Sequence, residues 1–264
     1  MESFNLKLKR IAKERKSLLC VGLDISSEAL GFDNLDKLKK HTFTVIDATR
    51  EYAVAYKPNL AFFERYGSKG FKWLEKTVEY IGSEHVIIAD AKRGDIGNTA
   101  EQYAKSIFDH FGFDCVTLNP YMGSDSIKPF INKPGKGVFV LCRTSNKSAS
   151  ELQDHPSSSN PIYEVVAKNV KELNVLDNIG LVVGATEPDV ISSVRELVPS
   201  VPFLIPGIGF QGGDLSSCVE AGNKNGLGII NISRGISFVG DRSEKAIHCA
   251  ASDYLDRIRK ILVK

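Results

Sequence analysis

The sequence lacks any long hydrophobic run. Its longest apolar stretch, 202–210, is broken by proline and glycine, so no segment reaches the roughly 20 apolar residues that a membrane-spanning helix needs. The segment from Lys7 to Lys16 is charged and has no apolar secretory core. Neither sign of charge is in excess, because 34 Lys and Arg balance 32 Asp and Glu. We therefore expect no membrane and no nucleic acid among the partners of this protein.

Cysteine and histidine are scarce and scattered. The five cysteines form no CxxC pair, and none of the five histidines has a spacing typical of a metal site or a nucleophile triad. Cys20, Cys115 and Cys142 lie inside apolar runs, where cysteine is usually a small core residue. We expect no metal site, no cofactor, structural histidines and a reducing, cytoplasmic compartment.

Eight short apolar or β-branched runs alternate with stretches that have the charge patterning of helices. This alternation predicts parallel strands joined by right-handed crossovers. Eight such units in 264 residues match an α/β fold, the (β/α)8 or TIM barrel, and we expect residues 1–264 to form a single barrel domain. The predicted strands are 18–23, 52–56, 85–89, 115–118, 138–142, 180–183, 203–206 and 228–232. The predicted helices are 35–55, 70–81, 99–111, 162–173, 188–197, 214–221 and 243–263.

The stretch Asp90-Ala91-Lys92-Arg93-Gly94-Asp95 directly follows a run that reads as a buried strand. Residues two apart on a strand face the same side, so Asp90 and Lys92 should point together. Burying such charges is costly unless they pair or do chemistry. A surface ion-pair network at a strand end is the alternative. Two carboxylates and a lysine at the tip of a buried strand favour an active site.

Polar residues also follow most of the other predicted strands. In barrels of this kind the chemistry sits at the C-terminal ends of the strands, and charged tips that converge from separate strands are a stronger signal than one motif. Asp24 could instead cap a turn, and Lys57 could extend along the surface, although its match in depth with Asp90 favours the site. The residues at these strand ends are Asp24, Lys57, Asp90, Lys92, Asn119, Thr144, Ser145, Gly207 and Arg234.

Two glycine-bearing loops follow the seventh and eighth predicted strands. The loop 206–214 precedes a helix, and its glycines let backbone N–H groups approach an anion closely. Ser233-Arg234-Gly235 occupies the same place after the eighth strand, where the forked guanidinium of Arg234 could hold a phosphate. Each loop could alone be an ordinary barrel turn, but together they favour a phosphate pocket. Neither has the spacing of a dinucleotide or ATP site.

The segment 143–160 is rich in Ser, Asn and Pro and is predicted to be a long loop. Loops of this length inside compact domains are often functional. Near its start, Thr144, Ser145 and Asn146 offer donors and acceptors that suit an amide-bearing base. A polar loop without a ligand remains the alternative.

These motifs together resemble those of the orotidine 5′-phosphate decarboxylase family. The segment 90–99 is similar to the family's DxKxxDI–T signature, and four further segments match in order and spacing. The versions at 57–64 and 207–214 are similar to the subgroup found mainly in bacteria. The matching segments are 21–24 (VGLD), 57–59 (KPN), 90–99 (DAKRGDIGNT), 206–214 (PGIGFQGGD) and 233–235 (SRG).

The resemblance implies a cofactor-free decarboxylation of orotidine 5′-monophosphate (OMP) to UMP, the last step of de novo pyrimidine synthesis. Lys92 would stabilise the C6 carbanion and protonate it, within a charge array completed by Lys57, Asp90 and Asp95. Asp95 and Thr99 would reach across a homodimer interface into the neighbouring subunit's site, and the loop 206–214 would be a lid. The implied substrate-binding residues are Asp24, Thr99, Ser145, Gln211, Arg234 and Gly235.

Two alternatives stay open. Related sugar-phosphate decarboxylases and synthases of the same barrel share the DxKxxD core, but they use magnesium and carry a glutamate and histidine arrangement that this sequence lacks. A non-catalytic nucleotide-binding barrel is the second alternative. Activity that survives EDTA would separate the first from a cofactor-free decarboxylase, and UMP binding without release of carbon dioxide would support the second.

Overall fold

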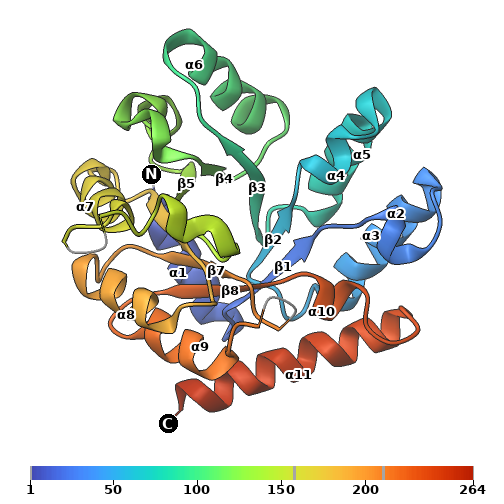
Figure 1. The fold of residues 1–264 in the computed structure, drawn as a ribbon. Helices are drawn as coiled ribbons and strands as arrows, with labels where there is room; N and C mark the ends of the chain where they lie inside the picture. The colour runs from blue at the N-terminus through green and yellow to red at the C-terminus, as the bar shows by residue number, and fades with distance from the viewer. Residues whose placement is uncertain (1, 157–158, 210–211, 264) are drawn as a thin grey trace.

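The computed structural model describes residues 2–156, 159–209 and 212–263, and eight parallel strands in these ranges close into one barrel. Each strand pairs with the next along the chain, and β8 pairs with β1, which confirms the predicted TIM barrel (Figure 1). The strands are β1 (Leu19–Leu23), β2 (Ala55–Pro58), β3 (Val86–Arg93), β4 (Cys115–Leu118), β5 (Gly137–Arg143), β6 (Ile179–Val183), β7 (Phe203–Pro206) and β8 (Gly228–Ile232).

Helices surround the strands and bury the outer face of the barrel (Figure 1). Because both faces of the sheet are covered, most residues of its strands are apolar and buried. None of the helices in the described ranges has the length and hydropathy to cross a membrane. The α-helices are α1 (Phe4–Arg15), α2 (Ser27–Leu30), α3 (Leu35–Thr49), α4 (Ala61–Glu64), α5 (Gly67–Ile81), α6 (Gly97–Lys105), α7 (Ile162–Leu173), α8 (Pro188–Leu197), α9 (Leu215–Asn223), α10 (Arg234–Ser237) and α11 (Glu244–Leu262).

The predicted bounds of β4, β7, β8, α7 and α8 agree with the structure, whereas those around β2 were wrong. The predicted helix 35–55 ends at Thr49, whose carbonyl accepts the N–H groups of both Tyr52 and Ala53 at 2.9 Å. Because of this turn, β2 begins at Ala55, three residues later than predicted, and ends at Pro58. In this register Lys57 lies opposite Gly22, near the C-terminal end of β1. The predicted helix 99–111 also differs, because α6 gives way to a π-helical turn, η1 (Ser106–His110).

Helix α1 closes the N-terminal end of the barrel, where the sequence analysis assigned only a charged segment. Ser3 caps this helix by accepting the N–H of Leu6 at 3.2 Å, and Phe4 and Leu8 bury one face of it. The ring of Phe4 occupies the space that a side chain at Gly137 would need, since a Cβ there would lie 2.1 Å from Phe4 Cδ1. The C-terminal end of the barrel, which α1 leaves open, carries the polar residues.

Candidate active site

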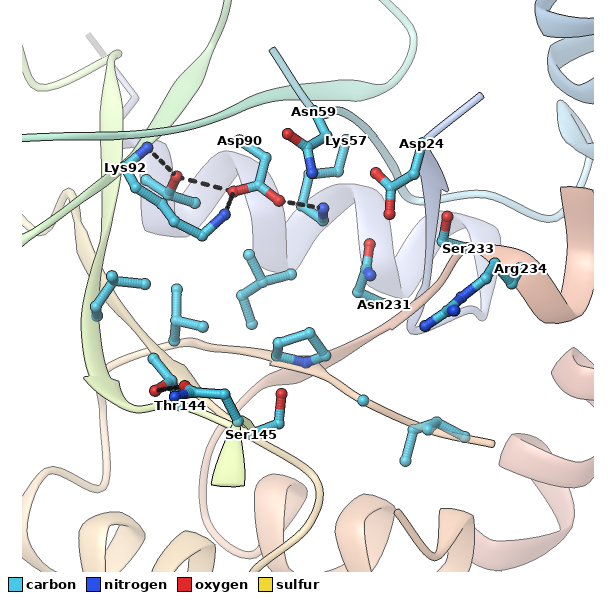
Figure 2. A pocket seen from close by; sticks show the side chains of 18 of the residues that line it. Asp24, Lys57, Asn59, Asp90, Lys92, Thr144, Ser145, Asn231, Ser233 and Arg234 are labelled. Atoms are coloured by element: carbon cyan, nitrogen blue, oxygen red, sulfur yellow. Dashed lines mark hydrogen bonds and ion pairs between the residues drawn. The ribbon is translucent and has the colours of Figure 1, made fainter. Parts of the chain in front are cut away.

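A cavity of about 490 Å³ opens at the C-terminal end of the barrel. Every strand, or the segment that follows it, contributes to its lining. Asp24, which directly follows β1, and the charged residues of β2 and β3 form one side, and Thr144 and Ser145 lie opposite them (Figure 2). Apolar side chains from β5, β6, β7 and the segment after β7 also line the cavity, namely Leu141, Val182, Leu204, Pro206 and Ile208. The cavity therefore combines an apolar slot with a charged wall, as ligand sites commonly do.

Asp90 is held between two lysines from neighbouring strands. Lys57 Nζ lies 2.6 Å from Asp90 Oδ2, and Lys92 Nζ lies 2.5 Å from Asp90 Oδ1 (Figure 2). The side chains of Lys57 and Asp90 are 5% and 10% exposed, whereas that of Lys92 is 50% exposed and lines the cavity. The buried Lys57–Asp90 pair thus supports one lysine that is open to a ligand, which is not the arrangement of a solvated surface ion pair.

The two buried members of this cluster stabilise each other's charge. Burial alone would raise the pKa of Asp90, but the attraction and hydrogen bonds of Lys57 and Lys92 hold it well below its ordinary value. Burial alone would lower the pKa of Lys57, but Asp90 and Asp24 raise it well above its ordinary value. At neutral pH the cluster therefore contains a carboxylate and a buried ammonium.

Two unsatisfied oxygens mark the part of the cavity near β1 and β8. In the described part of the chain, Asp24 Oδ1 and Ser233 Oγ are buried and have no hydrogen-bond partner. Both residues line the cavity. Because buried polar atoms in native proteins are normally paired, these two oxygens are suited to bind the hydroxyl groups of a ligand.

Ser145, Arg234 and Gly235 line the cavity, as the sequence analysis predicted for substrate contacts. Asp95 and Thr99 are not among the described lining residues. Asp95 Oδ1 instead accepts its neighbour's N–H, that of Ile96, at 2.8 Å, and Thr99 is exposed on α6. Their predicted service to a neighbouring subunit's site stays a prediction.

The predicted lid, 206–214, is described only in part, because Gln211 lies outside the described residues. Its backbone uses glycine where other residues fit poorly, since φ is 107° at Gly207, 77° at Gly209 and 89° at Gly212. The movement of this loop and the predicted contact of Gln211 with substrate stay predictions.

The long loop after β5 is folded back against the end of that strand. Arg143 donates from Nε and Nη2 to the Asp154 carboxylate at 2.7 and 3.1 Å. The Thr144 N–H donates to Gln153 Oε1 at 2.8 Å. These bonds bring Gln153 to the cavity beside Thr144 and Ser145. The predicted loop therefore lines the cavity, and it contains a short 3₁₀ helix, η5 (Lys147–Glu151).

Sequence reasoning missed cavity residues that lie inside the apolar strands. Thr117 of β4 and Asn231 of β8 both line the cavity. Each is a single polar residue in an otherwise apolar run, which is the only signal that could have identified it. Asn119, expected at the tip of β4, accepts the N–H of Tyr121 at 3.0 Å and is not among the described lining residues. Thr117 takes its place as the β4 contribution.

A closed eight-stranded barrel with a charged cluster at the C-terminal ends of its strands defines a TIM-barrel enzyme. The chain belongs to the orotidine 5′-phosphate decarboxylase / HUMPS family, whose sequence model matches residues 17–248. The family predicted from the sequence is thereby confirmed, while its subgroup stays a prediction.

Similar proteins match almost the whole chain. It is 45% identical over 248 residues to an orotidine 5′-phosphate decarboxylase of Dehalococcoides mccartyi, which covers 91% of this chain and 90% of that protein. It is 44% identical over 259 residues to that of Natronomonas pharaonis, with 94% and 95% covered. The solved structure of Leishmania donovani OMP decarboxylase superposes with a TM-score of 0.89 at 39% identity and covers 99% of both chains.

Proposed function

We propose that this protein is a carboxy-lyase that converts OMP to UMP. The observation that carries the proposal is the Lys57–Asp90–Lys92 cluster, which presents one ammonium to a cavity at the mouth of the barrel. Family membership and relatives about 45% identical over more than nine-tenths of the chain support it.

The phosphate, the ribose and the pyrimidine of the substrate bind at different places along the cavity. Arg234 and Gly235, the first two residues of α10, hold the phosphate together with the loop after β7. The unsatisfied oxygens of Asp24 and Ser233 bind the ribose hydroxyls. Ser145 contacts the amide edge of the pyrimidine, and this arrangement directs C6 toward the charged wall.

The chemistry requires a cation beside C6. When the bond from C6 to the carboxylate breaks, carbon dioxide leaves and the electron pair stays on C6, where no ring carbonyl can delocalise it as an enolate. Lys92 stabilises that charge more than the delocalised charge of the substrate carboxylate, which lowers the barrier. Lys92 Nζ then transfers a proton to C6, which gives UMP and a neutral amine that solvent reprotonates.

One lysine cannot supply the whole rate enhancement. Two unit charges about 4 Å apart interact by roughly 4 kcal/mol at an effective dielectric near 20. Enzymes typically lower barriers by about 8–23 kcal/mol. The remainder comes from the fixed geometry of Asp90 and Lys57 and from phosphate binding that holds the substrate in place.

The active form is a homodimer with shared sites. The segment after β3 lies against the segment after β4, since the Asn119 N–H donates to the Arg93 carbonyl at 2.8 Å. Ile96, Tyr121 and Met122 on these segments are 53%, 79% and 48% exposed. A second copy that covers this apolar face brings Asp95 and Thr99 of one subunit to the cavity of the other.

We propose the cytoplasm as the compartment. The five cysteines are all unpaired, and four of them are buried. Burial raises the pKa of the Cys20 thiol to about 12, so this residue stays an inert core thiol. Such cysteine usage fits a reducing environment.

The experiment is to follow the loss of OMP absorbance with the purified, metal-free protein in the presence of EDTA. Turnover with release of carbon dioxide is expected. UMP binding without turnover would favour a nucleotide-binding barrel, and turnover that needs added magnesium would favour the sugar-phosphate enzymes. In the described ranges no group of three or more His, Cys, Asp or Glu side chains is placed to hold a metal ion.

A further inference from the structure

Thr117 in β4 faces an irregular part of β3. The pairing of the two strands loses its register between Ala89 and Arg93, and Arg93 pairs with Leu118, the residue after Thr117. Three residues of β3, 90–92, therefore lie opposite Thr117 alone. A bulge of this kind leaves backbone groups without partners in the ladder of the sheet. Asp90 and Lys92 therefore meet across a bulge. The sequence had predicted that they meet through the regular alternation of a strand.

One hydroxyl group supplies hydrogen-bond partners to the backbone groups of this bulge. Thr117 Oγ1 accepts the N–H groups of Ala91 at 3.0 Å and Lys92 at 2.9 Å, and it donates to Asp90 Oδ1 at 3.2 Å. A hydroxyl has one proton and two lone pairs, so these three bonds use its whole capacity. Because Thr117 is only 2% exposed, water does not readily replace them.

The bulge sets the direction of the lysine that faces the cavity. Lys92 has a φ of 47°, in the left-handed region that residues with a side chain rarely adopt. The bond from its N–H to Thr117 holds this conformation, in which Lys92 Nζ reaches Asp90 Oδ1 at 2.5 Å. The same hydroxyl fixes that carboxylate oxygen, while Lys57 fixes the other.

We propose that Thr117 is a positioning residue for the decarboxylation, because its hydroxyl fixes the backbone of Lys92 and the carboxylate of Asp90 in one geometry. It acts through these two residues and transfers no proton to the substrate. This inference rests on the proposed function. It predicts that loss of the hydroxyl lowers turnover and leaves nucleotide binding in place, because the phosphate and base contacts come from other strands.

The test compares Thr117→Val, which keeps the shape of the side chain, with Thr117→Ser, which keeps the hydroxyl. The valine variant should lose about 100-fold in kcat, the scale expected for misplacing a reacting group by about 1 Å. Its Kd for UMP should stay within about threefold of the wild-type value, and the serine variant should keep kcat within about fivefold, because its three hydrogen bonds remain. Normalising kcat to the number of UMP-binding sites counts only folded protein.

Three results would overturn the inference: a valine variant with wild-type kcat, a serine variant as slow as the valine variant, or a UMP affinity that falls in parallel with kcat. If the valine variant does not fold, Thr117→Ala replaces it in the comparison with Thr117→Ser, because alanine removes the hydroxyl without adding bulk. A wild-type protein that binds UMP but does not turn over OMP would refute the proposed function instead.

Discussion

Lys57 Nζ lies 2.6 Å from Asp90 Oδ2, and the two side chains are 5% and 10% exposed. A buried charge is tolerated only while its partner remains, because the desolvation of each ion is repaid by the other. Of the two lysines that contact Asp90, Lys57 is the buried one, so it supports the site from within the barrel and Lys92 meets the ligand.

Lys57→Met should lower the free energy of unfolding at pH 7 by about 3 kcal/mol, since it removes the buried partner of Asp90 and leaves that carboxylate only the half-exposed Lys92. Urea unfolding measures it. The matched control is Lys133→Met, which breaks a pair with Asp109 of similar length, 2.8 Å, whose side chains are 55% and 54% exposed. The control substitution should lower the free energy of unfolding by about 0–1 kcal/mol. Equal losses in the two variants would contradict the structural role assigned to Lys57.

The stability of the protein should depend on pH through Asp90. Its pKa in the folded protein lies below the ordinary value of 3.8, so its contribution is present above that value and is lost as the pH falls below it. The pKa of Lys57 lies above 10.5, so its contribution is lost only at more alkaline pH. The difference in unfolding free energy between wild type and Asp90→Asn should be constant from about pH 5 to 10 and shrink below about pH 4. A difference that grows on acidification would show that the pKa of Asp90 is raised, not lowered, in the folded protein.

Arg234→Ala should lower kcat/KM for OMP by about 100-fold or more, because a charge-assisted contact to phosphate is lost. Added guanidinium should restore part of the activity by occupying the vacated space. The comparison variant is Arg10→Ala, in α1 at the opposite end of the barrel, which should behave as wild type with or without guanidinium. Full activity of Arg234→Ala without rescue would remove Arg234 from the phosphate site.

Mixing two inactive variants tests the shared site. Lys92→Ala and Asp95→Ala should each lose nearly all turnover, while Lys92→Ala retains affinity for UMP. After subunit exchange, half of the dimers are mixed and each has one site with both residues intact, so about one quarter of wild-type activity should return. Mixed dimers shown by mass spectrometry to have formed, yet inactive, would mean that both residues serve the site of their own chain.

The barrel and most of its charged tips could be predicted because each signal is local. An apolar run predicts a buried strand, and a charge directly after it, as at Asp24 or Asp90, must lie at the C-terminal end of that strand. Ser145 and Arg234 were found in the same way, from polar loops that follow strands. The closed barrel then brings these separate ends together around one cavity.

The remaining features depend on pairing that no local pattern reveals. The alternation of residues along a strand cannot show that β3 loses its register, so the role of Thr117 and the unusual backbone of Lys92 were not foreseen. A lone amide such as Asn231 in an apolar strand looks like any satisfied core residue. The helix begun by Phe4 was overlooked because its charged face dominates the composition of the segment.

The closure of the barrel by α1 has a consequence during synthesis. Asn5, near the start of that helix, donates to the carbonyl of Ile179, 174 residues later in the chain. Phe4 likewise packs against Phe139, with 6.1 Å between ring centroids. While the nascent chain leaves the ribosome, the apolar face of helix α1 therefore lacks this docking surface until the fifth and sixth strands have emerged. A growing chain exposes that face until these strands are made, and it is there that we expect a chaperone to bind.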